Sequence, residues 1–271
     1  MYKAAIAAIL VLFLTTSAFA DDNSVTISVE SAGSANTIVA QSSNLSRFTV
    51  TLNVTGANIK TSQPVPISVD SAGQHNVAIV VVQPLNPKAP SHFTWSYHWM
   101  PGGYSTIRST NYFYSLPYAA DKQFKVEQGF LGSFSHYQGS GSEYAVDWSM
   151  PVGTVVCACR GGVVVGVRVD SAAGGPNRKY ITCANYIIID HLDGTFGEYL
   201  HLSRRGSYVT LGQKVATGQP IGLSGNTGFS SNPHLHFSVF HTLDGSKRLE
   251  LPFKIQTRSR EVVTPIEGDA Y

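Results

Sequence analysis

Two histidines near the end of the chain have a spacing that could support metal or acid–base chemistry. His234 and His236 are separated by one apolar residue, within the run 233–237 of sequence PHLHF. Alternate side chains of a β-strand point to the same face, so both imidazoles would address one groove if this run is a strand. Such a pair also arises by chance, and buried or surface histidines are more often structural than catalytic. Other residues must therefore decide its meaning.

Three further side chains are candidates for the same site. His201 lies near the end of the apolar run 196–202, while His136 and Asp147 flank a segment rich in Gly and Ser. Asp147 lies between Val146 and Trp148, and a buried carboxylate needs a partner to offset its lost hydration. The glycine-rich run 218–228 is predicted to turn the chain back on itself just before the histidine pair.

A set of histidines with one aspartate suits a zinc ion. Catalytic zinc takes three protein ligands from His, Asp or Glu and leaves a fourth position for water. The metal lowers the pKa of that water towards about 7 and polarises a carbonyl, so an amide can be hydrolysed without a protein nucleophile. No serine or cysteine in a nucleophile-elbow motif is visible in the sequence.

The elements expected to hold these residues are β-strands. Residues 23–118 alternate short β-type runs with Gly and Pro turn signals and show no helical period, which predicts a β-sandwich-like module over residues 21–115. Residues 116–256 form a second predicted β domain with one or two short helical pieces at most, followed by a tail over 257–271. We therefore expect an all-β, mainly antiparallel protein. The predicted strands are 25–29, 48–54, 65–69, 77–82, 93–99 and 110–114 in the first part, and 155–158, 163–169, 186–190, 196–201, 214–215, 221–223 and 234–240 in the second.

Charge and the N-terminus limit the possible partners. The 271 residues carry a formal charge of +2, too little for a field that would hold nucleic acid. Lys3, the apolar run 4–14 and the small-residue pattern 18–20 (AFA) predict a signal peptide over residues 1–20. The apolar run is shorter than the ~20 residues of a spanning helix, so cleavage is favoured over an uncleaved membrane anchor. We expect a periplasmic or secreted monomer without stable membrane insertion.

The three cysteines fit such a compartment. Cys157 and Cys159 point the same way if they share a strand, and either could form one disulfide with Cys183 on a neighbouring strand. A thiol catalyst or a cysteine metal site is less favoured, because the sequence has no C-x-x-C motif and no histidine at ligand spacing from these residues.

From about residue 128 to residue 253 the sequence resembles the lysostaphin-like, LytM-type M23 family of zinc endopeptidases. The resemblance implies a compact antiparallel β-fold with a metal at one end of a groove, and activity on peptidoglycan peptides. Its matching positions are His136, Asp147, 151–155, Ala158, 162–164, Tyr199, His201, Leu202, Gly212, Val215, Gly218, Gly222, 224–228 and 234–237.

Carried over position by position, the resemblance makes His136, Asp147 and His236 the zinc ligands. His234 would be the general base, and His201 would hydrogen-bond the water or stabilise the oxyanion. His191 and His241 match no functional histidine of the family, and we interpret them as structural or exposed.

The separation of the first two ligands departs from the family pattern. Typical members keep the first histidine and the aspartate close together, whereas here residues 137–146 intervene. A longer loop costs little free energy, so both ligands can still converge. His92 or His98 would be the alternative first ligand.

The sequence thus favours a secreted zinc metalloendopeptidase acting on peptidoglycan peptides, with selectivity in loops such as 171–179. The alternatives are a catalytically inactive relative that regulates a cell-wall hydrolase, and a binding protein whose metal is structural. A structural zinc is normally closed by a fourth protein ligand, for which the sequence offers no candidate.

Overall fold

The structure is a computed structural model that describes residues 25–43, 45, 47–104 and 112–271. The predicted signal peptide lies outside these residues. The described chain divides into two compact units: one holds the residues up to Tyr104 together with Leu243–Lys247, and the other holds the residues from Tyr112 to Thr242 together with Arg248–Tyr271. Because residues 105–111 are not described, the domain boundaries drawn from the sequence stay predictions.

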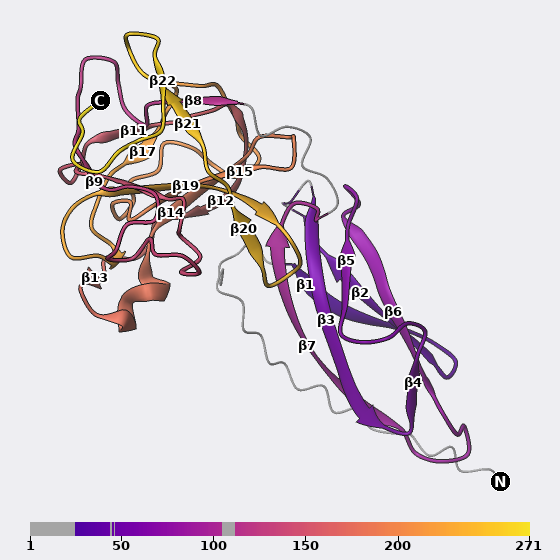
Figure 1. The fold of residues 1–271 in the computed structure, drawn as a ribbon. Helices are drawn as coiled ribbons and strands as arrows, with labels where there is room; N and C mark the ends of the chain where they lie inside the picture. Colours follow the sequence, from indigo (N-terminus) through magenta and orange to yellow (C-terminus); the bar gives the residue numbers. More distant parts are fainter. Residues whose placement is uncertain (1–24, 44, 46, 105–111) are drawn as a thin grey trace. The chain divides into compact units, whose positions relative to one another are not determined.

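The regular secondary structure of both units is almost wholly β-strand (Figure 1). The described residues contain one short 3-10 helix, η1 (Arg178–Cys183), and most strand pairs are antiparallel. The predicted all-β, mainly antiparallel fold is therefore confirmed. Among the described residues, no helix has the length and apolar character to span a membrane.

The first unit contains two antiparallel sheets. One has the strand order β1-β2-β6-β4 and the other the order β5-β3-β7. The predicted sandwich remains a prediction, and the sequence patterns missed β2 and β4. The strands are β1 (Thr26–Ala32), β2 (Ala35–Gln41), β3 (Phe48–Ala57), β4 (Ile59–Thr61), β5 (Ile67–Asp70), β6 (Asn76–Pro84) and β7 (His92–Pro101).

The second unit is built on an eight-stranded sheet with the order β16-β12-β14-β15-β19-β10-β9 and with β20 paired to β19. Small sheets β11-β17, β13-β18 and β22-β21-β8 complete it. The strands are β8 (Phe113–Ser115), β9 (Val126–Gln128), β10 (Val146–Trp148), β11 (Val155–Cys157), β12 (Gly162–Arg168), β13 (Gly174–Gly175), β14 (Tyr186–Asp190), β15 (Phe196–Leu200), β16 (Lys214–Val215), β17 (Pro220–Leu223), β18 (Gly228–Phe229), β19 (Leu235–Thr242), β20 (Arg248–Glu250), β21 (Lys254–Gln256) and β22 (Val262–Val263).

The core of this unit lies on one face of the large sheet. Along β19, Leu235, Phe237 and Val239 belong to the apolar cluster, and the alternate residues His236 and Ser238 do not. Burying each large apolar side chain contributes roughly 1.5–3 kcal/mol. Strand periodicity thus orients the polar side chains of β19 to the opposite face, where the histidines gather.

The last residues of the chain pack onto the second unit. The Tyr118 hydroxyl donates a hydrogen bond to the carbonyl of Tyr271 at 2.7 Å, and Lys125 forms a β-bridge with Ala270. Tyr271 also lies against the indole of Trp148, with 6.0 Å between ring centroids. The end of the chain therefore closes one side of the core.

The predicted disulfide is wrong. Cys157, Cys159 and Cys183 are free thiols. Cys157 ends β11 and is buried with Cys159 in the core, whereas Cys183 ends the 3-10 helix instead of lying on a paired strand. The spacing argument failed because it assumed a strand partner for Cys183.

Candidate metal centre

Strand pairing brings Asp147 and His236 together. In the antiparallel pair of β10 and β19, Asp147 lies directly opposite His236. Side chains opposite each other in such a pair are close enough to interact. The Nδ1 atom of His236 lies 2.8 Å from Oδ1 of Asp147, and both residues are buried. Asp147 therefore has the partner that a buried carboxylate needs.

His136 reaches the same carboxylate from a loop. Its Nε2 atom lies 3.3 Å from Oδ2 of Asp147, and its side chain has no exposed area. The intervening residues fold into turns, in which Gly139 and Gly141 adopt positive φ angles of 80° and 79°. The Leu131 amide donates to the carbonyl of Glu143 at 2.8 Å and closes the loop near its base. The long separation in sequence is thus compatible with close approach of the two side chains.

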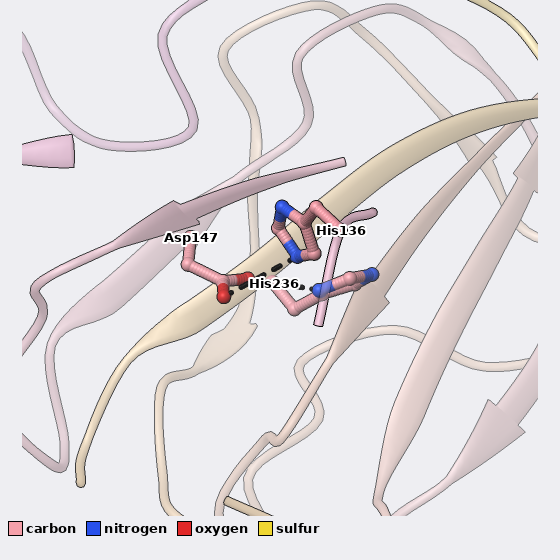
Figure 2. A group of neighbouring side chains, drawn as sticks. All are labelled: His136, Asp147 and His236. Carbon is pink, nitrogen blue, oxygen red and sulfur yellow. Dashed lines mark hydrogen bonds and ion pairs between the residues drawn. The ribbon is translucent and has the colours of Figure 1, made fainter. Parts of the chain in front are cut away.

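One ligand atom from each of these three residues lies within 4.8 Å of the others (Figure 2). The atoms face one another from β10, from β19 and from the loop before β10 (Figure 2). In contrast, the alternative first ligands His92 and His98 are exposed residues of β7 in the other unit. The geometry therefore groups His136 with Asp147 and His236.

The hydrogen-bonding chemistry of His136 points to a cation at this position. Its Nδ1 atom lies 3.1 Å from the carbonyl of Gly129, which can only accept, so a neutral His136 carries its proton on Nδ1. Nε2 then directs a lone pair at the carboxylate of Asp147, and it has no hydrogen-bond partner among the described residues. Two acceptors held face to face need a proton or a metal ion between them.

His201 and His234 stand beside this group and are anchored in the same way. Nδ1 of His201 lies 2.7 Å from the carbonyl of Thr227, and Nδ1 of His234 lies 2.8 Å from the carbonyl of Asn232. Their ring centroids are 4.5 Å apart. Each Nδ1 must donate to its carbonyl, so each neutral ring keeps Nε2 as a free acceptor.

All these side chains except His136 line one cavity of about 250 Å³. Pro176 also lines it, which brings part of the predicted selectivity loop 171–179 to the cavity wall. The lining residues are Glu127, Gln128, Ser133, Phe134, Ser135, Asp147, Pro176, His201, Phe229, Ser230, Ser231, Asn232, His234, His236 and Glu267.

Comparison with known proteins agrees with this geometry. Residues 141–248 match the sequence profile of peptidase family M23. These residues form a peptidase M23 domain. The matched region includes Asp147, His201, His234 and His236, and it begins after His136.

Two curated relatives illustrate the similarity of the M23 domain. Over 93 residues the chain is 44% identical to peptidoglycan DD-endopeptidase ShyA of Vibrio cholerae, which covers 34% of this chain and 19% of that protein. Over 98 residues it is 40% identical to glycyl-glycine endopeptidase ALE-1 of Staphylococcus capitis, which covers 36% of this chain and 24% of that protein. The matched segment spans less than a quarter of either relative.

Among solved structures, the chain matches the catalytic domain of lysostaphin from Staphylococcus simulans. The identity is 28%, the match covers 49% of this chain and 94% of that domain, and the TM-score is 0.35.

Within the M23 domain, the glycine-rich turn 224–228 positions His201. His201 itself has φ +64°, an unfavourable angle for a residue other than glycine. A Cβ on Gly225 would lie 2.8 Å from the carbonyl oxygen of His201, so glycine permits the turn to pack against this backbone. The turn then presents the carbonyl of Thr227 to the imidazole. Strained backbone of this kind concentrates at functional sites.

Two polar residues hold this turn, of which Thr227 lies in the run 224–228 singled out in the sequence and Asn185 was missed by sequence reasoning. The buried side chain of Asn185 donates to the carbonyl of Leu202 at 3.1 Å. The hydroxyl of Thr227 donates to the same carbonyl at 2.8 Å and accepts the amide of Asn185 at 3.0 Å. No local pattern signals this network, because its members are 17 to 42 positions apart in the chain.

The pKa of Asp147 favours binding of a cation at this site. Burial alone would raise the pKa of Asp147, but the imidazoles of His136 and His236 outweigh it and hold that pKa well below its usual range. Burial lowers the pKa of His236, an effect that Asp147 partly offsets. Burial, with the neighbouring His234 and His236, lowers the pKa of His201 to about 3. Burial alone would lower the pKa of His136, but Asp147 outweighs it and raises that pKa, so a metal ion bound here would displace a proton from the His136 imidazole.

A buried ion group lies on β15 and β20, the two strands that pair with β19 beyond His236. Arg248 contacts Glu198 at 2.8 Å and Glu250 at 3.0 Å. Burial raises the pKa of Glu250 to about 8, despite the opposing effect of Arg248. Glu198 lies opposite Ser238 on β19, two residues after His236. Polar side chains therefore continue along this face of β19 beyond His236.

Proposed function

We propose that this chain is a zinc metalloendopeptidase that hydrolyses peptide bonds in peptidoglycan stem or cross-bridge peptides. The observation that carries the proposal is the convergence of His136, Asp147 and His236 beside His201 and His234. Four of these residues also line one cavity and lie within the M23 match: Asp147, His201, His234 and His236.

The donor set fits zinc. Two imidazoles and one carboxylate are the ligand types found in catalytic zinc sites, which keep one position open for water. When bound, zinc activates a water molecule and polarises the scissile carbonyl. His136 would bind through Nε2, the buried atom that lacks a hydrogen-bond partner among the described residues. Asp147 supplies the single negative charge of the set, since its pKa lies well below the usual range.

His234 and His201 would handle the protons. Because their Nδ1 atoms are committed to backbone carbonyls, their Nε2 atoms remain acceptors for a proton from water. We assign the base role to His234, whose Nε2 lies 3.8 Å from Oδ1 of Asp147. His201 would orient the water, and a protonated Nε2 on either ring could donate to the developing oxyanion or to the leaving amine.

The substrate class is supported by the relatives and by the charge of the cavity. ShyA is named a peptidoglycan DD-endopeptidase and ALE-1 a glycyl-glycine endopeptidase. The cavity lining contains Glu127 and Glu267 but no lysine or arginine among the described residues, so it suits a neutral or cationic peptide. The predicted signal peptide would deliver the enzyme to the compartment that holds this polymer.

The two alternatives are less favoured. An inactive regulator would be expected to lack a metal ligand or a catalytic histidine, whereas all five residues are present here and lie close together. A purely structural zinc is normally closed by a fourth protein ligand, and the candidate group among the described residues has three members.

The test is digestion of peptidoglycan by the purified protein lacking residues 1–20. We expect about one zinc per chain and the conversion of cross-linked muropeptides to uncross-linked ones, whose masses identify the bond cut. Walls with direct DD-cross-links and walls with glycine bridges should be digested in parallel. Activity should disappear with 1,10-phenanthroline and return with added zinc.

Two outcomes would contradict the proposed function. A zinc-free protein that cleaves neither wall but stimulates a separate cell-wall hydrolase would replace the proposed function with the regulator. Cleavage that continues after complete removal of metal would contradict the mechanism.

A further inference from the structure

Gln128 is buried between the loop that carries His136 and the carboxylate of Asp147. It ends β9, where it lies opposite Asp147 of β10, and 6% of its surface is exposed. The family match begins at residue 141, so neither Gln128 nor His136 falls within it. The hydrogen bonds of Gln128 show how His136 is brought to Asp147 in this chain.

One end of the Gln128 side chain holds the loop. Its Oε1 atom accepts hydrogen bonds from the amides of Phe134 at 3.1 Å and Ser135 at 2.8 Å. The amide of His136 lies 3.4 Å from the same oxygen. These backbone groups directly precede the imidazole of His136, so Gln128 fixes the point from which that ring extends.

The other end holds the carboxylate. The Nε2 atom of Gln128 donates to Oδ2 of Asp147 at 3.0 Å and to the hydroxyl of Ser135 at 2.8 Å. The orientation of the carboxamide is unambiguous, because backbone amides can only donate and a carboxylate can only accept. Held through Oδ2, Asp147 directs Oδ1 towards Nδ1 of His236.

We propose that Gln128 is a positioning residue that sets the distance and the orientation between His136 and Asp147 for the metal ion. This inference rests on the proposed zinc site. The carboxamide of Gln carries an acceptor and a donor on the same carbon, and both are used here. A methionine of similar length would offer neither.

Close packing limits any other orientation of Gln128. A Cβ on Gly132 would lie 2.5 Å from Cγ of Gln128, so the loop passes directly over this side chain. Ligands whose outer partners are removed typically lose about 10- to 100-fold in metal affinity. We expect a loss of that size when the amide of Gln128 is removed.

The experiment measures zinc and Co²⁺ affinity of the full chain by competition with a chelator, together with the absorption spectrum of the Co²⁺ form at saturation. Gln128→Met should weaken both metals about 10- to 100-fold and shift the Co²⁺ bands, because the ligand geometry changes. Ser135→Ala is the matched control. It removes one hydrogen bond of Gln128 but leaves the contacts to Asp147 and to the loop amides, so affinity should stay within about threefold.

If Gln128→Met does not fold, a second variant tests the proposal. Gln128→Asn keeps the amide but is one methylene shorter, so it cannot reach both the loop and Asp147. It should also weaken metal binding and shift the Co²⁺ bands. If the folded Gln128 variants bind metal as tightly as the unmodified chain, with unchanged Co²⁺ spectra, Gln128 has no positioning role. If the unmodified chain itself binds no zinc or Co²⁺, the proposed function fails instead.

Discussion

The second unit contains two groups of buried histidines, and they differ in the groups that their ring nitrogens contact. His136, His201, His234 and His236 gather around Asp147. His191 and His241 are equally buried, but their Nδ1 atoms contact two adjacent residues: the hydroxyl of Thr195 at 3.1 Å and the carbonyl of Gly194 at 2.8 Å, respectively.

The comparison shows that burial alone does not mark a functional histidine. Nε2 of His191 faces the backbone at Gly197, where an added Cβ would lie 3.1 Å away. Its ring packs edge-on against Tyr114 at 5.5 Å between centroids. Asp147 lies within 4 Å of three rings in the first group, whereas the hydrogen-bond partners of His191 and His241 given above are a hydroxyl and a carbonyl. Convergence on a carboxylate separates the two groups.

The largest expected effect comes from removing a ligand of the first group. His236→Ala should reduce zinc from about one per chain to near none, and endopeptidase activity should fall by roughly 10³-fold or more because the water is no longer activated. Metal analysis and muropeptide release measure the two effects. The control is His98→Ala, which removes an exposed histidine of β7 and should change neither. Activity near the unmodified level in His236→Ala would falsify the assignment of this ligand.

A smaller effect is expected for a histidine of the first group that does not bind metal. Asn tolerates the positive φ of His201, and its amide can donate to the carbonyl of Thr227. His201→Asn should therefore keep zinc while lowering kcat/KM by about 10²- to 10⁴-fold, the usual contribution of a proton-transfer group. Loss of zinc together with activity would instead make His201 a ligand.

The smallest effect is expected for His191 of the second group, and it is a change in the free energy of unfolding. Burial and the nearby Arg160 lower the pKa of His191 to about 3. The folded protein therefore resists a proton that the unfolded chain accepts below pH about 6.5, and this contribution to stability is lost as the pH falls from 6.5 towards 3. His191→Gln cannot titrate, so its unfolding free energy should fall less steeply, by roughly 1.4 kcal/mol per pH unit at most.

Urea unfolding of the metal-free proteins between pH 7 and pH 4 measures this difference. His201 contributes with the same sign, since its pKa is also lowered to about 3, but it is present in both proteins and cancels. Activity of His191→Gln at neutral pH should match that of the unmodified chain. Identical slopes in the two proteins would mean that His191 titrates normally in the folded state.

Strands with strong local patterns could be predicted from the sequence. Residues 186–190 and 214–215 were predicted with the bounds that β14 and β16 have, because their apolar content and flanking turns are local signals. β9 and β10 were missed, since three-residue strands carry too little pattern. Cys183 was placed on a strand and lies instead in the 3-10 helix, which packs against β18, a strand far along the chain.

The sequence by itself determined the residue types of the site and the face that His236 takes on β19, because side-chain alternation in a strand is a local property. Only the tertiary structure decided that His236 meets Asp147, 89 positions away, and that His136 joins them. Strand register and loop closure depend on packing and hydrogen bonds between distant segments, such as those that Gln128 makes to the loop and to Asp147. No spacing along the chain encodes those distances.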